Sequence, residues 1–325
     1  MKKLWTEILM AAFFGLVVPW MILNAFTFQI QNHTETTAPT QRVPAVQKFM
    51  IPILMSDGST LTMELDSYIT CVVLGEMPPS FEPEAQKAQA VVARTYALRA
   101  YESGAKHPGG AVCTDPSCCQ GYRSKEDFLA QGGTETEYNQ INAIVHSTSG
   151  QVLIYGGELI EATYFSSSGG RTEDALAVWG SDVPYLRSTE SPEEAYMEKI
   201  LATVTFTAKE FSDALGVTLS GPPASWLGSV TYTSGGGIDT MVIGGVAYKG
   251  TTLRQLLKLR STAFTMTAVG DHITVTTKGH GHRVGMSQYG AEAMAVQGST
   301  YQQILAHYYQ GTTLTDWIDN TVDLG

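Results

Sequence analysis

One long segment with almost no charged residues sets the strongest limit on how this chain can fold. Pro83 suits the first turn of a helix and Gly104 suits its end, so we expect a helix over 84–103. Over most of that length the only charged residues are Lys87 and Arg94, and alanine and valine cover most of the circumference. A helix that is apolar on most sides is buried on most sides. The other elements must therefore pack around this one.

The segments around the helix mix strands and helices along the chain. The expected elements are a hairpin over 49–65, a strand or short helix over 66–74, a helix over 134–148, two strands over 150–165, a β-rich section with short helices over 202–277, and closing helices over 291–297 and 301–309. Strand runs that are separated from helix runs are typical of an α+β fold. We therefore expect a single mixed α+β catalytic domain with a long buried helix and a β-rich section.

The first residues of the chain differ in character from the rest. Lys2 and Lys3 precede an uncharged, mostly apolar run over 8–26, and about 20 such residues span a bilayer. Basic residues before the run predict that the N-terminus stays inside and the remainder lies outside. We expect residues 1–27 to form a cytoplasmic stub and a single transmembrane anchor. The alternative is a cleaved signal peptide, which would export the same remainder.

The remainder divides into a linker and one extracytoplasmic domain. Residues 28–45 are rich in Thr, Gln and Pro and lack apolar periodicity, so they predict a flexible linker. Residues 46–325 are enough for a domain with a sizeable core. The net charge of -11 argues against a nucleic-acid partner, because phosphate backbones are bound through basic surfaces.

Glu76 stands in apolar surroundings at the start of the long helix, in the sequence GEMPPSF. Apolar neighbours disfavour the charged form of a carboxyl group, which makes a proton donor available near neutral pH. Two observations weigh against this interpretation. A glutamate before two prolines can simply be an exposed loop residue, and a nearby helix N-terminus would favour the carboxylate.

Arg94 lies in the middle of the long helix among small residues. A buried guanidinium requires an acceptor. Lys87, seven residues earlier, points to nearly the same side of the helix, so the two cations could face an anionic group of a substrate or a structural carboxylate. Both interpretations of Arg94, functional and structural, stay open at this point.

A loop with the sequence HPGGAVCTDPSCCQGY is rich in metal-binding residue types. It places His107, Cys113, Cys118 and Cys119 within 13 residues. Thiolates and an imidazole suit zinc, and we expect these four to hold one structural ion, with Cys118 as the weakest member. A disulfide such as Cys113–Cys119 is the alternative outside the cytoplasm, and free thiols are a third state.

Two further segments combine glycines with polar side chains. SSSGGRTED follows an expected strand, and KGHGHRVGMSQYG precedes a closing helix. Such segments allow close backbone approach to a polar ligand, although the first could also be an ordinary Ser/Gly turn. We expect 166–171 and 281–289 to form opposite walls of a substrate groove. The candidate substrate-binding residues are Tyr164, Ser166, Ser167, Ser168, Arg171, His282, Ser287, Gln288 and Tyr289.

Taken together, these blocks resemble stage II sporulation protein D and its relatives, which include the amidase-enhancer domain family. The resemblance covers roughly residues 46–315. It rests on YITCVVLGEMPPSFEPEAQKAQAVVARTYAL, on the loop ending in CQGY, on ATYFSSSGGRTED with VWG and PYLRS, on LRSTAF, and on GHRVGMSQYGAEAMA with ILAHYYQGTTL. Relatives typically have glycine where this chain has Arg283, a cation that could bind a substrate carboxylate or obstruct the groove.

The resemblance implies a lytic transglycosylase that acts on the glycan strands of peptidoglycan during engulfment in sporulation. It implies Glu76 as the catalytic acid, suggests Arg94 as a functional residue, and implies zinc in the His/Cys loop of some relatives. The implied partners are glycan strands without stem peptides and stage II sporulation proteins P and M. The residues themselves do not show whether the peptides must be removed first.

Two other function classes remain open at the level of the sequence. One is a non-catalytic module that binds wall glycan or activates an amidase. The other is a zinc hydrolase that uses the His/Cys loop. A single carboxyl group is enough for intramolecular transglycosylation, because no water has to be activated. The resemblance therefore favours the transglycosylase. Digestion of glycan strands separates the three classes, because a non-catalytic module yields no products, a hydrolase yields reducing ends and transglycosylation yields anhydro ends.

Overall fold

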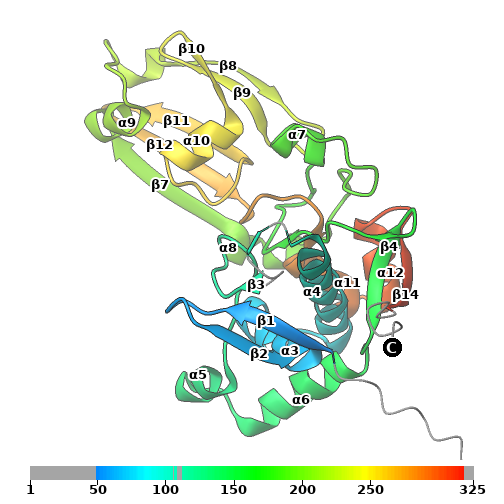
Figure 1. Cartoon of the computed structure of the whole chain (residues 1–325). Coiled ribbons are helices and arrows are strands. Elements are labelled where there is room, and N and C mark those ends of the chain that lie inside the picture. The colour runs from blue at the N-terminus through cyan, green and yellow to red at the C-terminus, as the bar shows by residue number, and fades with distance from the viewer. Residues whose placement is uncertain (1–48, 105, 108–111, 318–325) are drawn as a thin grey trace, which may run out of the picture. The chain divides into compact units, whose positions relative to one another are not determined.

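The computed structural model describes residues 49–104, 106–107 and 112–317 (Figure 1). The expected transmembrane anchor over 1–27 and the linker over 28–45 lie outside these residues. Within the described ranges, no helix is both long and apolar enough to cross a membrane. The fold is a mixed α+β arrangement of helices and several small sheets, as the sequence predicts.

The predicted long helix is α4, Pro83–Ser103, and it is the central element. Pro83 occupies the first turn, and Gly104 ends the helix in the left-handed conformation at φ 55°. Four helices and one strand contact it: α3 (Leu65–Glu76), α6 (Glu135–His146), α11 (Gln288–Val296), α12 (Tyr301–Tyr308) and β4 (Gln151–Tyr155). Twelve of its residues are buried, from Ala85 to Leu98. The expectation of a helix buried on most sides is confirmed.

Helix α3, Leu65–Glu76, follows the hairpin of β1, Met50–Leu54, and β2, Thr60–Glu64. The sequence did not distinguish a strand from a helix over 66–74. Nine residues of α3 are buried, on all sides of the helix, so the apolar residues show no helical period. Strand β3, Val112–Cys113, joins β1 in parallel and gives the sheet order β2-β1-β3.

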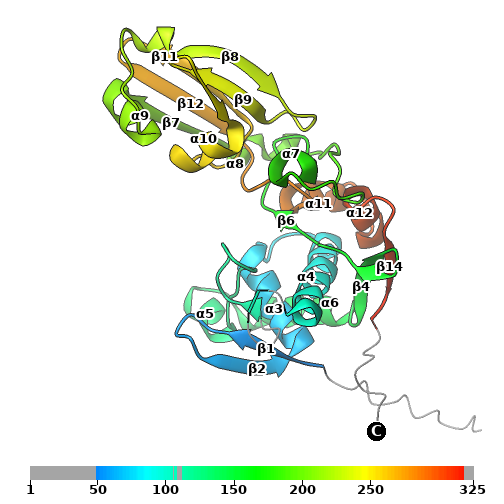
Figure 2. The same ribbon diagram turned by 45° about the horizontal axis from the view of Figure 1, so that its top comes forward.

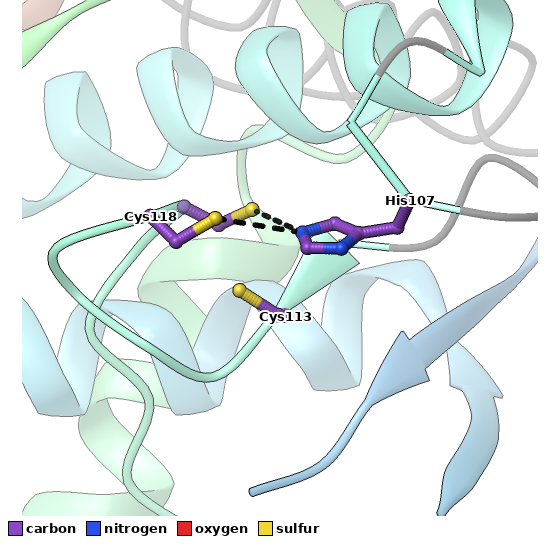
Figure 3. Close-up of side chains that lie close together, drawn as sticks. His107, Cys113 and Cys118 are labelled. Atoms are coloured by element: carbon purple, nitrogen blue, oxygen red, sulfur yellow. Dashed lines mark hydrogen bonds between the residues drawn. The ribbon is translucent and has the colours of Figure 1, made fainter. Parts of the chain in front are cut away.

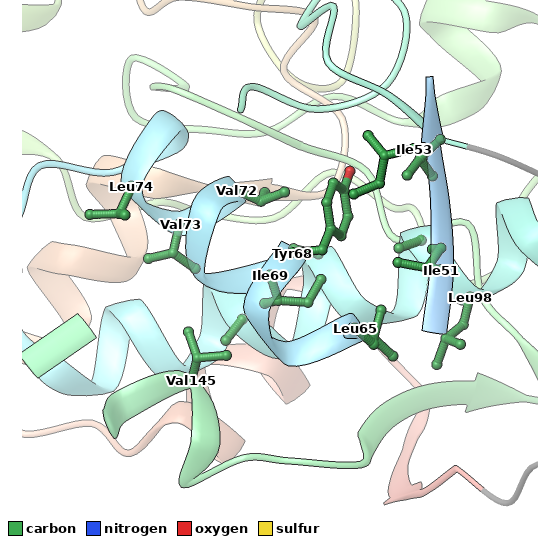
Figure 4. Packing of buried hydrophobic residues seen from close by; sticks show 14 of the residues in the cluster. Ile51, Ile53, Leu65, Tyr68, Ile69, Val72, Val73, Leu74, Leu98 and Val145 are labelled. Atoms are coloured by element: carbon green, nitrogen blue, oxygen red, sulfur yellow. The ribbon is translucent and has the colours of Figure 1, made fainter. Parts of the chain in front are cut away.

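The first hydrophobic core lies between β1, α3, α4 and α6 (Figure 4). Ile51 and Ile53 come from β1, Tyr68 and Ile69 from α3, and Leu98 from α4, and all five are fully buried. Burial of a large aliphatic or aromatic side chain contributes about 1.5–3 kcal/mol. This core therefore fixes α3 against α4, and with it the position of the C-terminal residue of α3, Glu76.

The central part of the chain supplies short helices and a second sheet. The elements are α5, Lys125–Ala130; α6, Glu135–His146; β4, Gln151–Tyr155; β5, Glu158–Leu159; and β14, Thr313–Asp316. Thr134 caps α6 in a capping box with Glu137, so the predicted start of this helix is confirmed. The sheet order is β14-β4-β5, which brings the C-terminal strand beside the strand that follows α6.

Two short strands and three helices build the second core against the other side of α4. They are β6, Tyr164–Phe165; α7, Ala175–Trp179; β13, Met286–Ser287; α11, Gln288–Val296; and α12, Tyr301–Tyr308. Strand β6 pairs with β13 in parallel, Tyr164 opposite Met286 and Phe165 opposite Ser287. The segments that carry the two polar motifs of the sequence are therefore joined directly to each other.

The predicted β-rich section forms two antiparallel sheets with a core of its own (Figure 2). Its elements are η3, Glu194–Tyr196; α8, Met197–Ile200; β7, Leu201–Thr207; α9, Ala208–Leu215; η4, Pro223–Ser225; β8, Leu227–Tyr232; β9, Ile238–Ile243; β10, Val246–Lys249; α10, Gly250–Leu256; β11, Phe264–Val269; and β12, His272–Lys278. The sheet orders are β10-β9-β8 and β11-β12-β7. The section starts and ends at one place, because the Gly279 amide donates to the Ile200 carbonyl.

Candidate active site

Glu76 is the last residue of α3, and three groups from distant parts of the chain donate hydrogen bonds to its carboxylate. The Gly121 amide and the Tyr164 hydroxyl donate to Oε1, the latter over 3.1 Å, and the Gln288 side-chain amide donates to Oε2 over 3.2 Å. Hydrogen bonds of this kind hold a carboxylate in one orientation. Sequence reasoning had proposed Glu76, Tyr164 and Gln288, and the structure brings all three together.

The sequence analysis did not single out Gly121, although this residue lies in the CQGY motif. A Cβ atom at this position would lie 2.9 Å from Glu76 Oε1. A Cβ atom at Gly75 would in turn lie 2.9 Å from the Gly121 carbonyl carbon. Both positions must therefore be glycine for the end of α3 and the CQGY backbone to approach this closely.

Tyr164 links Glu76 to a second residue that the sequence analysis did not single out, Gln120. The Tyr164 hydroxyl lies 3.1 Å from Glu76 Oε1 and 3.1 Å from Gln120 Oε1. Gln120 is 1% exposed, and its amide nitrogen donates to Tyr68 Oη over 3.2 Å. Burial and the adjacent Glu76 raise the pKa of Tyr164 well above its ordinary value. Tyr164 therefore stays protonated and offers one proton to two acceptors.

Glu76 opens onto a cleft of about 610 Å³. Its lining includes Tyr96, Lys106, Cys118 and Cys119 from α4 and the His/Cys loop, Tyr164 and Ser166 from the β6 segment, and Trp179, Arg254, His280 and His282 from farther along the chain. The cleft thus combines a carboxyl group, hydroxyls, aromatic faces and cations. This is a suitable mixture for a sugar polymer, whose hydroxyls need hydrogen bonds and whose ring faces pack on aromatic side chains.

His282 lies between two aromatic side chains in this cleft. Its ring is 5.2 Å from the Trp179 ring and 5.6 Å from the Phe165 ring, between centroids. Its Nδ1 accepts the Val284 amide over 3.2 Å. Burial, with a smaller contribution from the charge of Arg254, lowers the pKa of His282 to about 4. His282 is therefore neutral at pH 7 and can donate from Nε2.

The Ser-rich segment contributes less to the cleft than expected. Ser166 lines it, but Ser167 and Ser168 are buried. The Ser168 amide and hydroxyl both donate to Glu193, a fully buried carboxylate that the sequence analysis missed. Ser287 also donates to Glu193 and caps α11 through the Gly290 amide. Ser168 and Ser287 thus position the loops, and their hydroxyls are not free to bind sugar.

The expectation that 166–171 and 281–289 form opposite walls is wrong. Strand β6 pairs in parallel with β13, and the Tyr289 amide donates to the Ser166 carbonyl. Ser167 also forms an antiparallel bridge with His280, just before the second segment. The two segments are therefore neighbours on one wall. The sequence could not show this, because the polar and glycine content of a segment carries no information on its pairing partner.

Two other substrate-binding candidates lie away from the cleft lining. Arg171 is exposed, donates to Ser188 Oγ over 3.0 Å and approaches Glu190 at 3.7 Å, beside a separate cavity. The Tyr289 ring packs on Phe81 and Tyr196, with centroids 5.3 and 5.2 Å apart. Tyr289 thus packs beside Gln288 and steadies the segment that contacts Glu76.

Arg94 is fully buried and has structural partners. Its guanidinium donates to Asp66 Oδ1 through Nη2 over 2.8 Å and through Nε over 3.0 Å. The Val145 and Gln151 carbonyls and the Thr148 hydroxyl accept the remaining donors. It neither contacts Glu76 nor lines the cleft, so the geometry favours the structural interpretation. Lys87 is paired separately, with Glu84 at 2.6 Å.

Arg283 neither reaches a substrate nor obstructs the groove, contrary to both expectations. It is 2% exposed and pairs with the fully buried Glu173 at 2.8 Å. It also donates to the carbonyls of Ser168, Arg171 and Gly235. Its backbone has a positive φ of 68°, a conformation that glycine adopts readily. The side chain therefore fastens the Ser-rich segment to the β-rich section.

The four residues of the predicted metal site lie together (Figure 3). The ligand atoms of His107, Cys113, Cys118 and Cys119 all lie within 4.8 Å of one another. His107 Nε2 is 3.3 Å from Cys119 Sγ and 3.7 Å from Cys118 Sγ. Ligands of a tetrahedral zinc ion are about 3.5–3.8 Å apart, given Zn–S and Zn–N bonds of about 2.3 and 2.0 Å. The residues present fit the ion, and all four cysteines of the chain are free.

Comparisons with known proteins define the class to which this site belongs. A family model described as "Stage II sporulation protein" matches residues 58–155, the span that carries Glu76, α4 and the His/Cys loop. The chain is 43% identical over 272 residues to stage II sporulation protein D of Bacillus subtilis (strain 168), covering 82% of this chain and 79% of that protein.

Two further relatives extend the comparison. Stage II sporulation protein D of Bacillus amyloliquefaciens is 42% identical over 291 residues, which cover 88% of this chain and 83% of that protein. The amidase enhancer of Bacillus subtilis (strain 168) is 31% identical over 307 residues, which cover 76% of this chain and 40% of that protein. The chain belongs to the stage II sporulation protein D family.

Proposed function

We propose that this protein is a lytic transglycosylase, a lyase that cleaves the glycan strands of peptidoglycan and leaves 1,6-anhydro-muramyl ends during engulfment in sporulation. The observation that carries the proposal is the setting of Glu76. One carboxyl group, held by three donors, faces a cleft lined with hydroxyl and aromatic groups. Membership of the sporulation family is consistent with a cell-wall substrate.

The reaction needs one residue that first gives and then takes a proton. Protonated Glu76 would transfer its proton to the glycosidic oxygen, which leaves C1 of the muramic acid with the bonding electron pair. The resulting carboxylate would take the proton of the C6 hydroxyl, whose oxygen forms a new bond to C1. The proton returns to Glu76, and no water enters the products. General acid–base catalysis of this kind contributes about 10²–10⁴-fold.

Tyr164 can form a hydrogen bond with Glu76 whether the carboxyl group is protonated or ionised. When Glu76 is ionised, Tyr164 can donate its proton to Oε1. When Glu76 is protonated, the carboxyl group can donate to Tyr164, and Tyr164 can turn its own proton to Gln120 Oε1, at the same 3.1 Å. A hydroxyl has one donor and two acceptor positions, so Tyr164 can form a hydrogen bond with Glu76 in either state.

We propose that His107, Cys113, Cys118 and Cys119 hold one structural zinc ion. Four protein ligands complete a tetrahedral site and leave no position for a water molecule, which is typical of a structural role and argues against a zinc hydrolase. Cys118 and Cys119 also line the cleft. The ion would therefore hold the CQGY backbone, including the Gly121 donor, against Glu76.

The location and partners follow from the sequence and the family resemblance. We propose a single-pass membrane protein with residues 1–27 as the anchor, residues 28–45 as the linker and residues 46–325 as the extracytoplasmic domain. The proposed partners are peptidoglycan glycan strands and stage II sporulation proteins P and M. A second candidate function, an amidase-activating module without catalysis, is favoured by the 31% identity to the amidase enhancer.

The test compares two carboxylate variants on purified glycan strands. Glu76→Gln keeps the size of the side chain but has no proton to transfer, so it should fold normally and lose cleavage by at least about 10²-fold. Glu161→Gln is the matched control, because Glu161 is an exposed carboxylate in the same cleft. Equal activity of Glu76→Gln and wild type would remove Glu76 from the mechanism. Absence of products from the wild type would favour the non-catalytic module.

A further inference from the structure

The three thiols of the His/Cys cluster differ in their access to solvent. Cys113 ends β3 and is 7% exposed. Cys118 and Cys119 are only partly buried and line the cleft, and Cys118 directly follows three exposed residues, 115–117. The sulfur atoms of Cys113 and Cys118 lie close to the His107 ring (Figure 3). Reactive cysteines are partly exposed, whereas enclosed thiols are inert, so Cys118 is the thiol that a reagent in the cleft can reach.

The backbone that carries Cys118 continues directly to the proposed catalytic acid. Lys106 donates to the Cys118 carbonyl, and Tyr96 Oη donates to the same oxygen over 3.4 Å. The chain then runs through the CQGY motif to Gly121, whose amide donates to Glu76 Oε1. One short backbone segment therefore joins the cluster to the carboxyl group, and a rearrangement of the cluster changes the contacts of Glu76.

We propose that Cys118 is a site of thiol–disulfide exchange, and that its oxidation to a disulfide with Cys113 releases the zinc ion and inactivates the enzyme. This inference rests on the proposed zinc site and the proposed function. The ligand atoms of the cluster all lie within 4.8 Å of one another, so Cys113 is within reach of Cys118 after a small movement. Cys119 is a poorer partner, because a disulfide between adjacent residues is strained.

The exchange needs an external disulfide, RSSR, as its oxidant. The Cys118 thiolate attacks one sulfur of RSSR, forms a mixed disulfide and releases one RS⁻. The Cys113 thiolate then attacks Cys118 Sγ, forms the Cys113–Cys118 bond and releases the second RS⁻. The two cysteine sulfurs together lose two electrons, and RSSR gains two. The ion would keep only His107 and Cys119 as protein ligands and would leave as Zn²⁺, since only thiolates bind it among the sulfur species.

The exchange would act on catalysis through the position of the loop. A disulfide between Cys113 and Cys118 pulls the two sulfurs together, whereas a tetrahedral ion keeps its ligands about 3.5–3.8 Å apart. The loop must shift, and the Gly121 amide then no longer holds Glu76 in its orientation. Exposed disulfides are readily reduced, so an excess of a small thiol together with zinc would restore the active form.

The experiment treats the zinc-loaded protein with oxidised glutathione. It measures zinc release with a chelating dye, maps disulfides by mass spectrometry without reduction, and follows glycan cleavage. Cys118→His is the test variant, because it keeps a zinc-binding side chain but has no sulfur. Cys71→Ser is the matched control, because Cys71 is buried and free but lies outside the cluster.

The wild type and Cys71→Ser should each release one zinc ion per chain, form the Cys113–Cys118 disulfide and lose cleavage by about 10-fold or more, the effect of one charge-assisted hydrogen bond. Dithiothreitol with zinc should reverse all three changes. Cys118→His should keep its zinc, and its cleavage rate should be the same before and after the oxidant.

Three outcomes would overturn the inference: a wild type that keeps its thiols in excess oxidised glutathione, a disulfide that leaves out Cys118, and zinc release from Cys118→His as fast as from the wild type. Undiminished cleavage by the Cys113–Cys118 disulfide form would overturn the coupling to Glu76. Absence of cleavage before oxidation would contradict the proposed function, while zinc release and the mapped disulfide would still decide the chemistry of Cys118.

Discussion

The hydroxyl of Tyr164 lies 3.1 Å from Oε1 of Glu76, and the same oxygen lies 3.1 Å from Oε1 of Gln120. Tyr164 comes from β6, whereas Glu76 ends α3. The contact therefore joins two parts of the chain that are 88 residues apart. It gives the proposed acid a partner that can either donate or accept a hydrogen bond as Glu76 changes its protonation state.

We predict that Tyr164→Phe lowers the rate of glycan cleavage by about 10–100-fold, because Glu76 loses a partner that adapts to both of its states. Stability should fall by about 1–2 kcal/mol, since Gln120 Oε1 loses its donor. Tyr309→Phe is the matched control: Tyr309 is fully buried, does not line the cleft and donates to the Thr163 carbonyl over 2.7 Å. It should lose similar stability and keep its activity. Similar activities of the two variants would contradict the role of Tyr164.

The buried pair of Arg94 with Asp66 predicts an effect on stability. Removal of one partner leaves an unpaired charge in the core, so Arg94→Gln should lower the free energy of unfolding by about 3–5 kcal/mol, measured by urea denaturation. Lys209→Ala, which breaks an exposed pair with Asp213, should have little effect. A variant Arg94→Gln with wild-type stability and no cleavage would instead support the catalytic role suggested by the family resemblance.

His282 predicts a loss of stability at acid pH. Its pKa is lowered to about 4 in the folded chain from 6.5. As the pH falls below 6.5, the unfolded chain binds the proton first, so the stability present above pH 6.5 is lost between pH 6.5 and 4. The expected loss is about 1–3 kcal/mol. Urea denaturation at pH 7 and pH 4.5 should show a smaller pH dependence in His282→Gln than in the wild type. The exposed-histidine variant His146→Gln should behave as the wild type.

The metal site predicts one zinc ion per chain in elemental analysis of the purified protein. Cys113→Ser should lose the ion and lower the melting temperature by roughly 5–10 °C, which corresponds to a loss of about 3 kcal/mol. Cys71→Ser is the control, because Cys71 is buried and free but lies outside the cluster. A metal-free protein with a mapped Cys113–Cys119 disulfide would defeat this prediction.

The sequence predicted those helices whose ends are set by the residues at their own termini. Pro83 and Gly104 marked the ends of α4, and the helix expected over 134–148 corresponds to α6. The sequence did not decide between strand and helix over 66–74, because a helix buried on all sides shows no amphipathic period. The pairing of β6 with β13 was missed because each strand has two residues, and their partners lie more than 100 positions apart.

The sequence predicted which residues lie in the site better than it predicted what each of them does there. Glu76, Tyr164, Gln288 and the His/Cys cluster were found because each belongs to a motif with its own chemistry. Gln120 and Glu193 were missed, since the type of a polar residue does not show which residues it will contact in the folded chain. Arg94 and Arg283 carried charges that looked functional, and only their partners, Asp66 and Glu173, show that both are held inside the domain.

The most direct test of the central claim is digestion of purified glycan strands in water enriched in ¹⁸O, followed by mass spectrometry of the products. Intramolecular closure of the C6 oxygen onto C1 takes no oxygen from water. The account predicts products with 1,6-anhydro-muramyl ends and no ¹⁸O, formed by the wild type and by Glu161→Gln but not by Glu76→Gln. Reducing ends that carry ¹⁸O would identify a hydrolase and contradict the account.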